Sequence, residues 1–205
     1  MIPNPTVSYA SPGTTGSLTF TPTANANGSA TISVTVNDGQ PANNTITRTF
    51  TVTVNPVNDV PTLAAISDAT INEDASAQTV SLSGISSGAA NESQTLTITA
   101  TSSNPSLIPN PSVSYTSPNA TGSLSYTPVA NASGTATITV TVNDGQAANN
   151  TVSRTFNVTV NPVNDAPTAG NLSLAGREDE ALSGDLLAAA AGIDSTALAA
   201  RNSSN

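Results

Sequence analysis

The sequence has no cysteine, histidine, lysine or tryptophan. Without cysteine there is no disulfide framework, and cysteine usage does not indicate whether the protein resides in an oxidising or a reducing compartment. The commonest general base, the thiolate nucleophile and the Schiff-base amine are missing as well, so we expect no enzyme. Glu73 and Asp74 make a poor acid–base pair, because adjacent residues of an extended chain point to opposite faces.

Positive charge is also scarce. The chain has four arginines and thirteen acidic residues, so its net charge is −9. This charge argues against nucleic acid and anionic membranes as partners. No apolar run approaches the length that spans a bilayer, so we expect no membrane insertion of this chain. The remaining composition is rich in Thr, Ser, Asn, Val and Ala with only 8% charged residues, which favours an extracellular, cell-surface location.

The main feature that the sequence does contain is an internal repeat. Residues 2–62 return at 108–168 with a constant offset of 106 residues and no gap, and 46 of the 61 pairs are identical. A fixed period of this length indicates an array of like modules, each large enough to bury its own core. We therefore divide the chain into the C-terminal part of a module at 1–55, a complete module at 56–161 and the N-terminal start of a third at 162–205.

The complete module is predicted to be all-β. The runs 135–143 and 151–160 alternate apolar and polar residues, and the loop between them predicts a hairpin. Arg154 shares the apolar face of its run, so we expect it at the strand's rim. The predicted core residues of the two runs are Ala136, Ile138, Val140, Val142, Val152, Phe156, Val158 and Val160.

Five further strands are predicted upstream, at 63–71, 78–85, 94–102, 112–116 and 122–127. Seven short strands in about 100 residues, separated by Gly, Pro and Asn, predict a seven-stranded β-sandwich of immunoglobulin or cadherin type. The fold class is therefore all-β, with tandem sandwich modules of which one is complete and two are partial. All six aromatic residues fall at three repeat positions, where we expect core packing rather than ligand stacking.

Residues 1–54 hold only the later strands of a module, so one apolar face should lie open. That face could pair with another chain, fray, or lean against the complete module, and the sequence does not choose among these alternatives.

The boundaries between modules carry a distinctive series of motifs. Asp144-Gly145 is followed, after a loop, by the run Thr155–Thr168, which contains Asn-Pro-Val-Asn-Asp-Ala-Pro. The acidic motif Ile71–Asp74 follows Asp59, and Arg177–Glu180 follows Asp165 in the same way. These motifs resemble the cadherin-like and bacterial Ig-like tandem repeats of very large bacterial surface proteins and adhesins.

The resemblance implies calcium held between modules, since Ca²⁺ takes six to eight oxygen ligands from carboxylates, amides and main-chain carbonyls. In such sandwiches the loop between the last two strands lies nearest the preceding module, and the early Glu lies at the opposite end. The implied ligands are Asn58, Asp59 and Asp144 at the first junction, and Glu73, Asn164 and Asp165 at the second. Asp38 would serve a junction outside this chain.

The chain departs from the family pattern at 86–92, where cadherin-like repeats often carry Asp-x-Asp. Glu92 could substitute in part, but two carboxylates are missing. The alternative is a linker that binds no metal, because Asn-Asp and Asp-Gly are ordinary turn formers. Prolines at 56, 61, 162 and 167 would stiffen the joints even without metal.

Two functions follow as hypotheses. The first is a non-catalytic spacer or adhesion repeat of a bacterial surface protein, whose partners are neighbouring modules of the same chain and surface proteins or glycans. The alternative is a carbohydrate-binding module of a secreted polysaccharide-active enzyme. Aromatic residues make up only 3% of the chain, which leaves little with which to build a sugar-binding platform.

Overall fold

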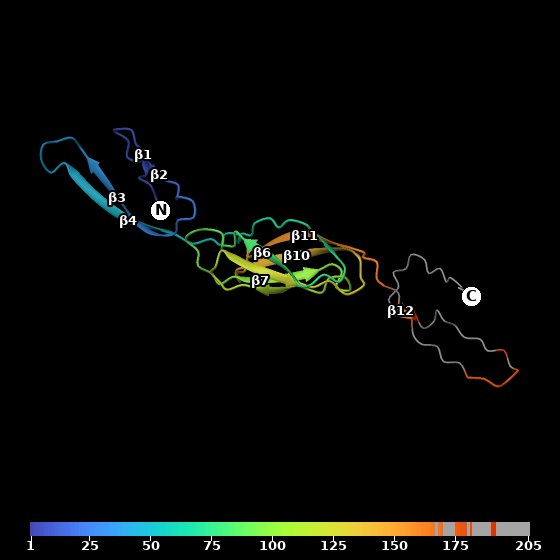
Figure 1. The fold of residues 1–205 in the computed structure, drawn as a ribbon. Helices are drawn as coiled ribbons and strands as arrows, with labels where there is room; N and C mark the ends of the chain where they lie inside the picture. The colour runs from blue at the N-terminus through green and yellow to red at the C-terminus, as the bar shows by residue number, and fades with distance from the viewer. Residues whose placement is uncertain (167, 170–174, 180, 182–189, 192–205) are drawn as a thin grey trace.

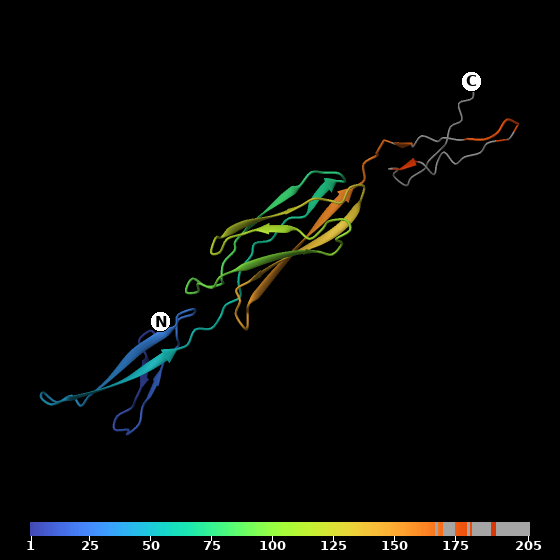
Figure 2. The ribbon, with the colours of Figure 1, turned by 90° about the horizontal axis from the view of Figure 1, so that it is seen from below.

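A computed structural model describes the chain apart from residues 167, 170–174, 180, 182–189 and 192–205. All secondary structure in the described part is β-strand. The N-terminal strands and the central sandwich lie end to end, joined by an extended linker (Figures 1 and 2). Among the described residues there is no long apolar helix of the kind that crosses a membrane.

The complete module is a two-layer sandwich of seven strands, as predicted. Its larger sheet has the order β5-β11-β10-β7, and its smaller sheet has the order β6-β9-β8. The named pairs are antiparallel except for β5, which runs parallel to β11. The strands are β5 (Ala69–Asn72), β6 (Gln78–Ser83), β7 (Thr97–Ser102), β8 (Ser112–Ser114), β9 (Thr121–Tyr126), β10 (Gly134–Asn143) and β11 (Thr151–Asn161).

The core lies between the two sheets and is built by the predicted alternation. Apolar residues of the central strand β10 are buried, from Ala136 to Val142. They pack with Leu82 and Leu124 of the opposite sheet and with Phe156 of β11 in one cluster. Threonines on the outer face of β10 are partly covered, because β10 has a neighbouring strand on each side.

The prediction of a strand over 63–71 is wrong for residues 63–68, since β5 begins only at Ala69. The opening segment changes sheets here: Thr62 bridges Ser86 beside the smaller sheet, and the chain then crosses to pair with β11. Leu63 is buried at this crossing and its carbonyl accepts a hydrogen bond from Arg154 Nε at 3.1 Å. Arg154 is exposed at the rim, as expected, with its guanidinium tied to the crossing.

The strand predicted to start at residue 94 begins instead at Thr97. The Leu96 amide donates to Ser117 Oγ at 3.0 Å, so a side chain rather than a neighbouring strand takes that hydrogen bond. Strands β6 and β8 each end two residues before the predicted limits.

Residues 1–55 form two separate strand pairs. Strands β1 (Thr6–Ser8) and β2 (Ser17–Thr19) pair antiparallel, as do β3 (Gly28–Asn37) and β4 (Thr45–Val54). The β3–β4 register matches that of β10–β11, with Ile32 opposite Phe50 as Ile138 is opposite Phe156. The apolar face stays open here, because Val36 is 60% exposed whereas its counterpart Val142 is fully buried. This part does not lean its apolar face on the complete module.

Little of the third part falls within the described residues. Strands β12 (Thr168–Ala169) and β13 (Ala190–Ala191) pair antiparallel. The acidic residues Glu178 and Asp179 are exposed, and Glu180 lies outside the described residues, as does most of the remaining segment.

Candidate functional site at the module junctions

The linker into the complete module is held by the side chain of Asn58. Its Nδ2 lies among four oxygens: Asp144 Oδ2 at 2.9 Å, the carbonyls of Ala148 at 3.0 Å and Asn149 at 3.2 Å, and its neighbour Asp59's carbonyl at 3.2 Å. Asn149 Nδ2 donates in return to the Asn58 carbonyl at 3.1 Å. An amide nitrogen has only two hydrogens for these four acceptors. The linker is thus held to the β10–β11 loop by hydrogen bonds in both directions.

Local turn chemistry positions Asp144 for this contact. Asn143 Oδ1 accepts from the Gly145 amide at 2.6 Å, and Asp144 Oδ1 accepts from the Gln146 amide at 2.9 Å. Such side-chain-to-backbone bonds are what Asn and Asp supply in tight turns. The turn leaves Asp144 Oδ2 for Asn58, and Asp144 is only 3% exposed.

A second loop closes on the linker from the other side. Glu92 Oε1 accepts from the Asp59 amide at 2.9 Å, and Gln94 Nε2 donates to Asn58 Oδ1 at 3.0 Å. Glu92 Oε2 and Gln94 Oε1 are buried and have no hydrogen-bond partner. Burying a polar atom without a partner costs roughly 1–3 kcal/mol, so the junction presents two unsatisfied oxygens beside a recess of about 400 Å³.

The close fit of this loop depends on Gly88. A Cβ at this position would lie 2.7 Å from the Val60 carbonyl oxygen and 2.9 Å from Asp59 Cβ, and the backbone φ is +115°. Gly145 also has a positive φ, of +77°, but a Cβ there would meet nothing within 4 Å.

We therefore expect Gly88→Ala to destabilise the complete module more than Gly145→Ala does. Gly145→Ala should cost about 1–2 kcal/mol for the left-handed backbone alone. Gly88→Ala should cost about 1–3 kcal/mol more, because the linker must also move. Urea denaturation of both variants measures the difference, and equal losses would show that the linker does not rest on this loop.

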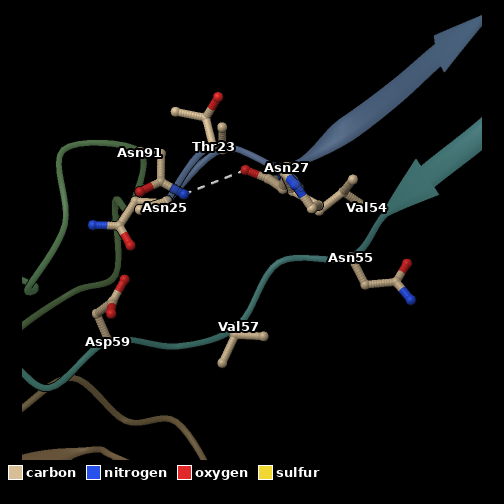
Figure 3. Close-up of a pocket in the computed structure, with 11 residues that line it drawn as sticks. Thr23, Asn25, Asn27, Val54, Asn55, Val57, Asp59 and Asn91 are labelled. Carbon is tan, nitrogen blue, oxygen red and sulfur yellow. Dashed lines mark hydrogen bonds between the residues drawn. The ribbon is translucent and has the colours of Figure 1, made fainter. Parts of the chain in front are cut away.

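A cleft of about 260 Å³ separates residues 1–55 from the complete module (Figure 3). Asn91 Nδ2 crosses it to Asn27 Oδ1 at 3.3 Å, and Asp59 and Val57 line it from the linker. Residues 1–55 and the complete module are therefore connected here by the Asn27–Asn91 hydrogen bond and by the linker itself.

The second junction uses Glu73, at the opposite end of the sandwich. The Glu73 amide donates to the Asn161 carbonyl at 2.9 Å, which extends the parallel β5–β11 pairing by one step. This places the side chain beside the outgoing linker, where Glu73 Oε1 accepts from the Val163 amide at 2.7 Å. Glu73 is 7% exposed, so a carboxylate anchors the linker at this end as well.

The structure thus brings some of the predicted ligands together and not others. Asn58 and Asp144 are in direct contact, and Asp59 adjoins them through its main chain. Glu73 meets its linker at Val163, one residue before Asn164, whose Nδ2 donates to the Asp165 carbonyl at 3.2 Å. Sequence reasoning missed Gln94 and Asn149, because nothing in a polar run or an Asn-rich loop marks which residue faces a distant linker.

The first junction holds carboxylate, amide and main-chain oxygens, which are the ligands that Ca²⁺ prefers. The side-chain nitrogens of Asn58, Gln94 and Asn149 lie among them. Glu92 Oε1 accepts from the linker, and Oε2 of the same carboxylate is buried without a hydrogen-bond partner, so it is an oxygen available to a cation. Across the described residues, no three acidic, His or Cys side chains converge into a ready metal site. The donor set therefore fits a calcium ion only when side-chain amides and main-chain carbonyls complete it.

Aromatic side chains of the complete module are used in packing. Tyr126 and Phe156 are 5% and 2% exposed and belong to the core, and Tyr115 packs against it. Burial raises the pKa of the Tyr126 phenol. These three rings offer no exposed platform for sugar stacking.

Two family models match the sequence. The model of the bacterial Ig domain matches residues 58–159, and that of the cadherin-like domain matches residues 9–55. Residues 9–55 and 58–159 are therefore cadherin-like and bacterial Ig-like repeats. Because the two matched segments contain near-identical sequence, the two models describe one kind of module. A search of curated proteins finds no match.

Several solved structures are similar to this chain at low identity. The titin domains Z1Z2 in complex with telethonin are 14% identical, with a TM-score of 0.37 over 56% of this chain and 54% of that one. Domains 4 and 5 of the S-layer protein SbsC are 20% identical, with a TM-score of 0.35 over 70% and 62%. Zebrafish RET cadherin-like domains 1 to 4 are 16% identical, with a TM-score of 0.30 over 66% and 34%. This chain spans about half the length of the titin chain and less than two thirds of the other two.

Proposed function

We propose that this chain is a non-catalytic stretch of spacer or adhesion repeats from a large bacterial surface protein. The hydrogen bonds that hold the linker at Asn58 are the main observation in favour of this proposal. Four oxygens surround one linker side chain, and three of them belong to the β10–β11 loop. A linker bound in this way fixes the direction in which the preceding module joins the complete one, which is what a spacer requires and an independent binding domain does not.

The two ends of the complete module support this role together. Asp144 binds the incoming linker and Glu73 binds the outgoing one, and both carboxylates are buried. Prolines at 56 and 61 restrict the incoming linker further. A force that acts on one linker is therefore transmitted to the sandwich, because the bound linker cannot rotate freely about its junction.

Calcium is part of the proposal at the first junction. Glu92 and Asp144 would supply carboxylate oxygens to the ion, together with side-chain oxygens of Asn58 and Gln94 and main-chain carbonyls. Asp59, whose side chain lines the cleft toward residues 1–55, would join them only by turning toward Glu92. When bound, the ion neutralises carboxylates that otherwise repel one another across the linker. Among extracellular modules, dissociation constants of about 10⁻⁴–10⁻³ M are typical.

We expect the melting temperature of the full chain to rise when EGTA is replaced by 10 mM calcium. At such affinities, that concentration contributes roughly 1.4–2.7 kcal/mol by mass action, or a rise on the order of 5 °C or more. Glu92→Gln should remove most of the rise. Asp38→Asn is the control, because Asp38 occupies the same kind of turn in residues 1–55 but is exposed.

The outcomes separate the parts of the proposal. A rise that survives in Glu92→Gln would remove calcium from this junction. No rise at all, with the linker amides still protected from hydrogen exchange, would leave a metal-free spacer. Unprotected linker amides under both conditions would contradict the spacer itself.

A further inference from the structure

The sequence contains one Asn-Gly step, Asn27–Gly28. Its counterpart in the complete module is Ser133–Gly134, so the two copies of the repeat differ at this position. Asn27 is exposed, and Gly28 opens strand β3 with a φ of +123°. Asparagine is among the thermolabile side chains, and a glycine after it places no Cβ near its amide carbon. Asn27 therefore meets less steric obstruction from the next residue than any other asparagine of the chain.

Asn27 also lies at the cleft between residues 1–55 and the complete module (Figure 3). Asn91 Nδ2 donates to Asn27 Oδ1 at 3.3 Å. Among the described residues, no other hydrogen bond joins residues 1–55 to the complete module. Asp59 is the only charged residue among the described residues that line the cleft. A change in the charge of Asn27 would therefore act on the direct contact between the two modules.

We propose that Asn27 is a site of spontaneous deamidation, which places a second carboxylate at this cleft. The main-chain nitrogen of Gly28 forms a bond to Asn27 Cγ, the Cγ–Nδ2 bond breaks, and the amide group leaves as ammonia with the proton of the Gly28 nitrogen. Water then adds to either carbonyl of the cyclic imide, breaks its bond to nitrogen and returns a proton to that nitrogen. The products are aspartate and isoaspartate, and both carry a free carboxylate. Water is the only co-reactant.

The new carboxylate changes the contact between the modules. It still accepts from Asn91, but it has lost the Nδ2 donor of the asparagine and shares the cleft with Asp59. Like charges at exposed positions repel weakly, and salt screens them. Isoaspartate also adds a methylene to the main chain immediately before the first residue pair of β3 and β4, Gly28 and Val54. The significance of this change rests on the proposed spacer function, whereas the reaction itself does not.

Peptide mapping of the full chain by mass spectrometry, after ageing in mildly alkaline buffer, tests the site directly. Asn25 and Asn131 are internal controls, because both are exposed, have φ of 58° and 56°, and precede alanine. We expect acid to form at Asn27 at least about tenfold faster than at either control, because a Cβ on the following residue slows closure of the imide. Mildly acidic buffer should slow the reaction, because the Gly28 nitrogen must lose its proton to attack. Equal rates at the three asparagines would overturn the proposal.

The NMR signal of the Asn91 side-chain amide tests the placement of the new charge at the cleft. It should shift as the parent chain ages, because the acceptor of Asn91 Nδ2 becomes a carboxylate. Asn27→Ser, which matches the repeat partner Ser133, should form no acid at this position and show no such shift on ageing. Asn27→Asp should show a shifted signal without ageing. Acid at Asn27 with an unchanged Asn91 signal would contradict this placement, whereas protection of the linker amides tests the spacer function separately.

Discussion

Phe156→Ala is expected to lower the free energy of unfolding of the complete module by about 3–5 kcal/mol. The ring is 2% exposed and lies opposite Ile138 in the register of β10 and β11. It packs between the sheets, so its removal leaves a cavity that the rigid strand pairs cannot collapse to fill.

The repeat supplies an internal control for this change. Phe50 has the same strand neighbour, Ile32, in the same register, but it is 44% exposed. Phe50→Ala should therefore cost less than about 1 kcal/mol. Hydrogen exchange of the full chain in urea reports the stability of β4 and β11 separately. Similar losses at the two positions would mean that the two strand pairs share one core, contrary to the exposures.

Asp144→Ala is expected to release the incoming linker and to destabilise that end of the module by about 1.5–3 kcal/mol, the range for hydrogen bonds to a charged group. The substitution removes the acceptor of both Asn58 Nδ2 and the Gln146 amide. It also leaves Asn58 with only main-chain acceptors. Exchange of the amides of residues 57–60 and 62 should quicken before any change in the core strands.

Asp38→Ala is the matched control for Asp144. Asp38 accepts from the Gln40 amide at 3.0 Å, as Asp144 does from Gln146, but it is exposed. Its replacement should cost about 0.5–1 kcal/mol, the contribution of one ordinary hydrogen bond. If Asp38→Ala were as damaging as Asp144→Ala, the turn rather than the linker contact would be responsible.

The two turns also show how far sequence reasoning reaches. In both repeats an Asn side chain accepts from the Gly amide two residues on, at 2.7 Å from Asn37 and 2.6 Å from Asn143. The turn depends on bonds between residues two apart, so identical sequence builds identical turns. The burial of Asp144, unlike Asp38, depends on Asn58, which is 86 residues away in the chain.

The fold of the complete module follows the same division. Alternating residues predict all seven strands and the buried face of β10, because a strand places successive side chains on opposite faces. The late start of β5 was not predictable from that pattern. It arises because Thr62 bridges Ser86 beside the smaller sheet and the chain then crosses to pair with β11 of the larger sheet. An apolar run has the same pattern whichever sheet it joins.

The sequence by itself determined the repeat, the all-β class, the strands, the hairpin turns and the absence of the usual catalytic side chains. These properties depend on composition and on neighbours a few residues apart. Only the tertiary structure decided that Asn58 meets Asp144, that Glu92 and Gln94 close on the same linker, and that residues 1–55 do not lean their apolar face on the complete module. Those contacts join residues far apart in the chain, so they exist only once the two sheets have packed.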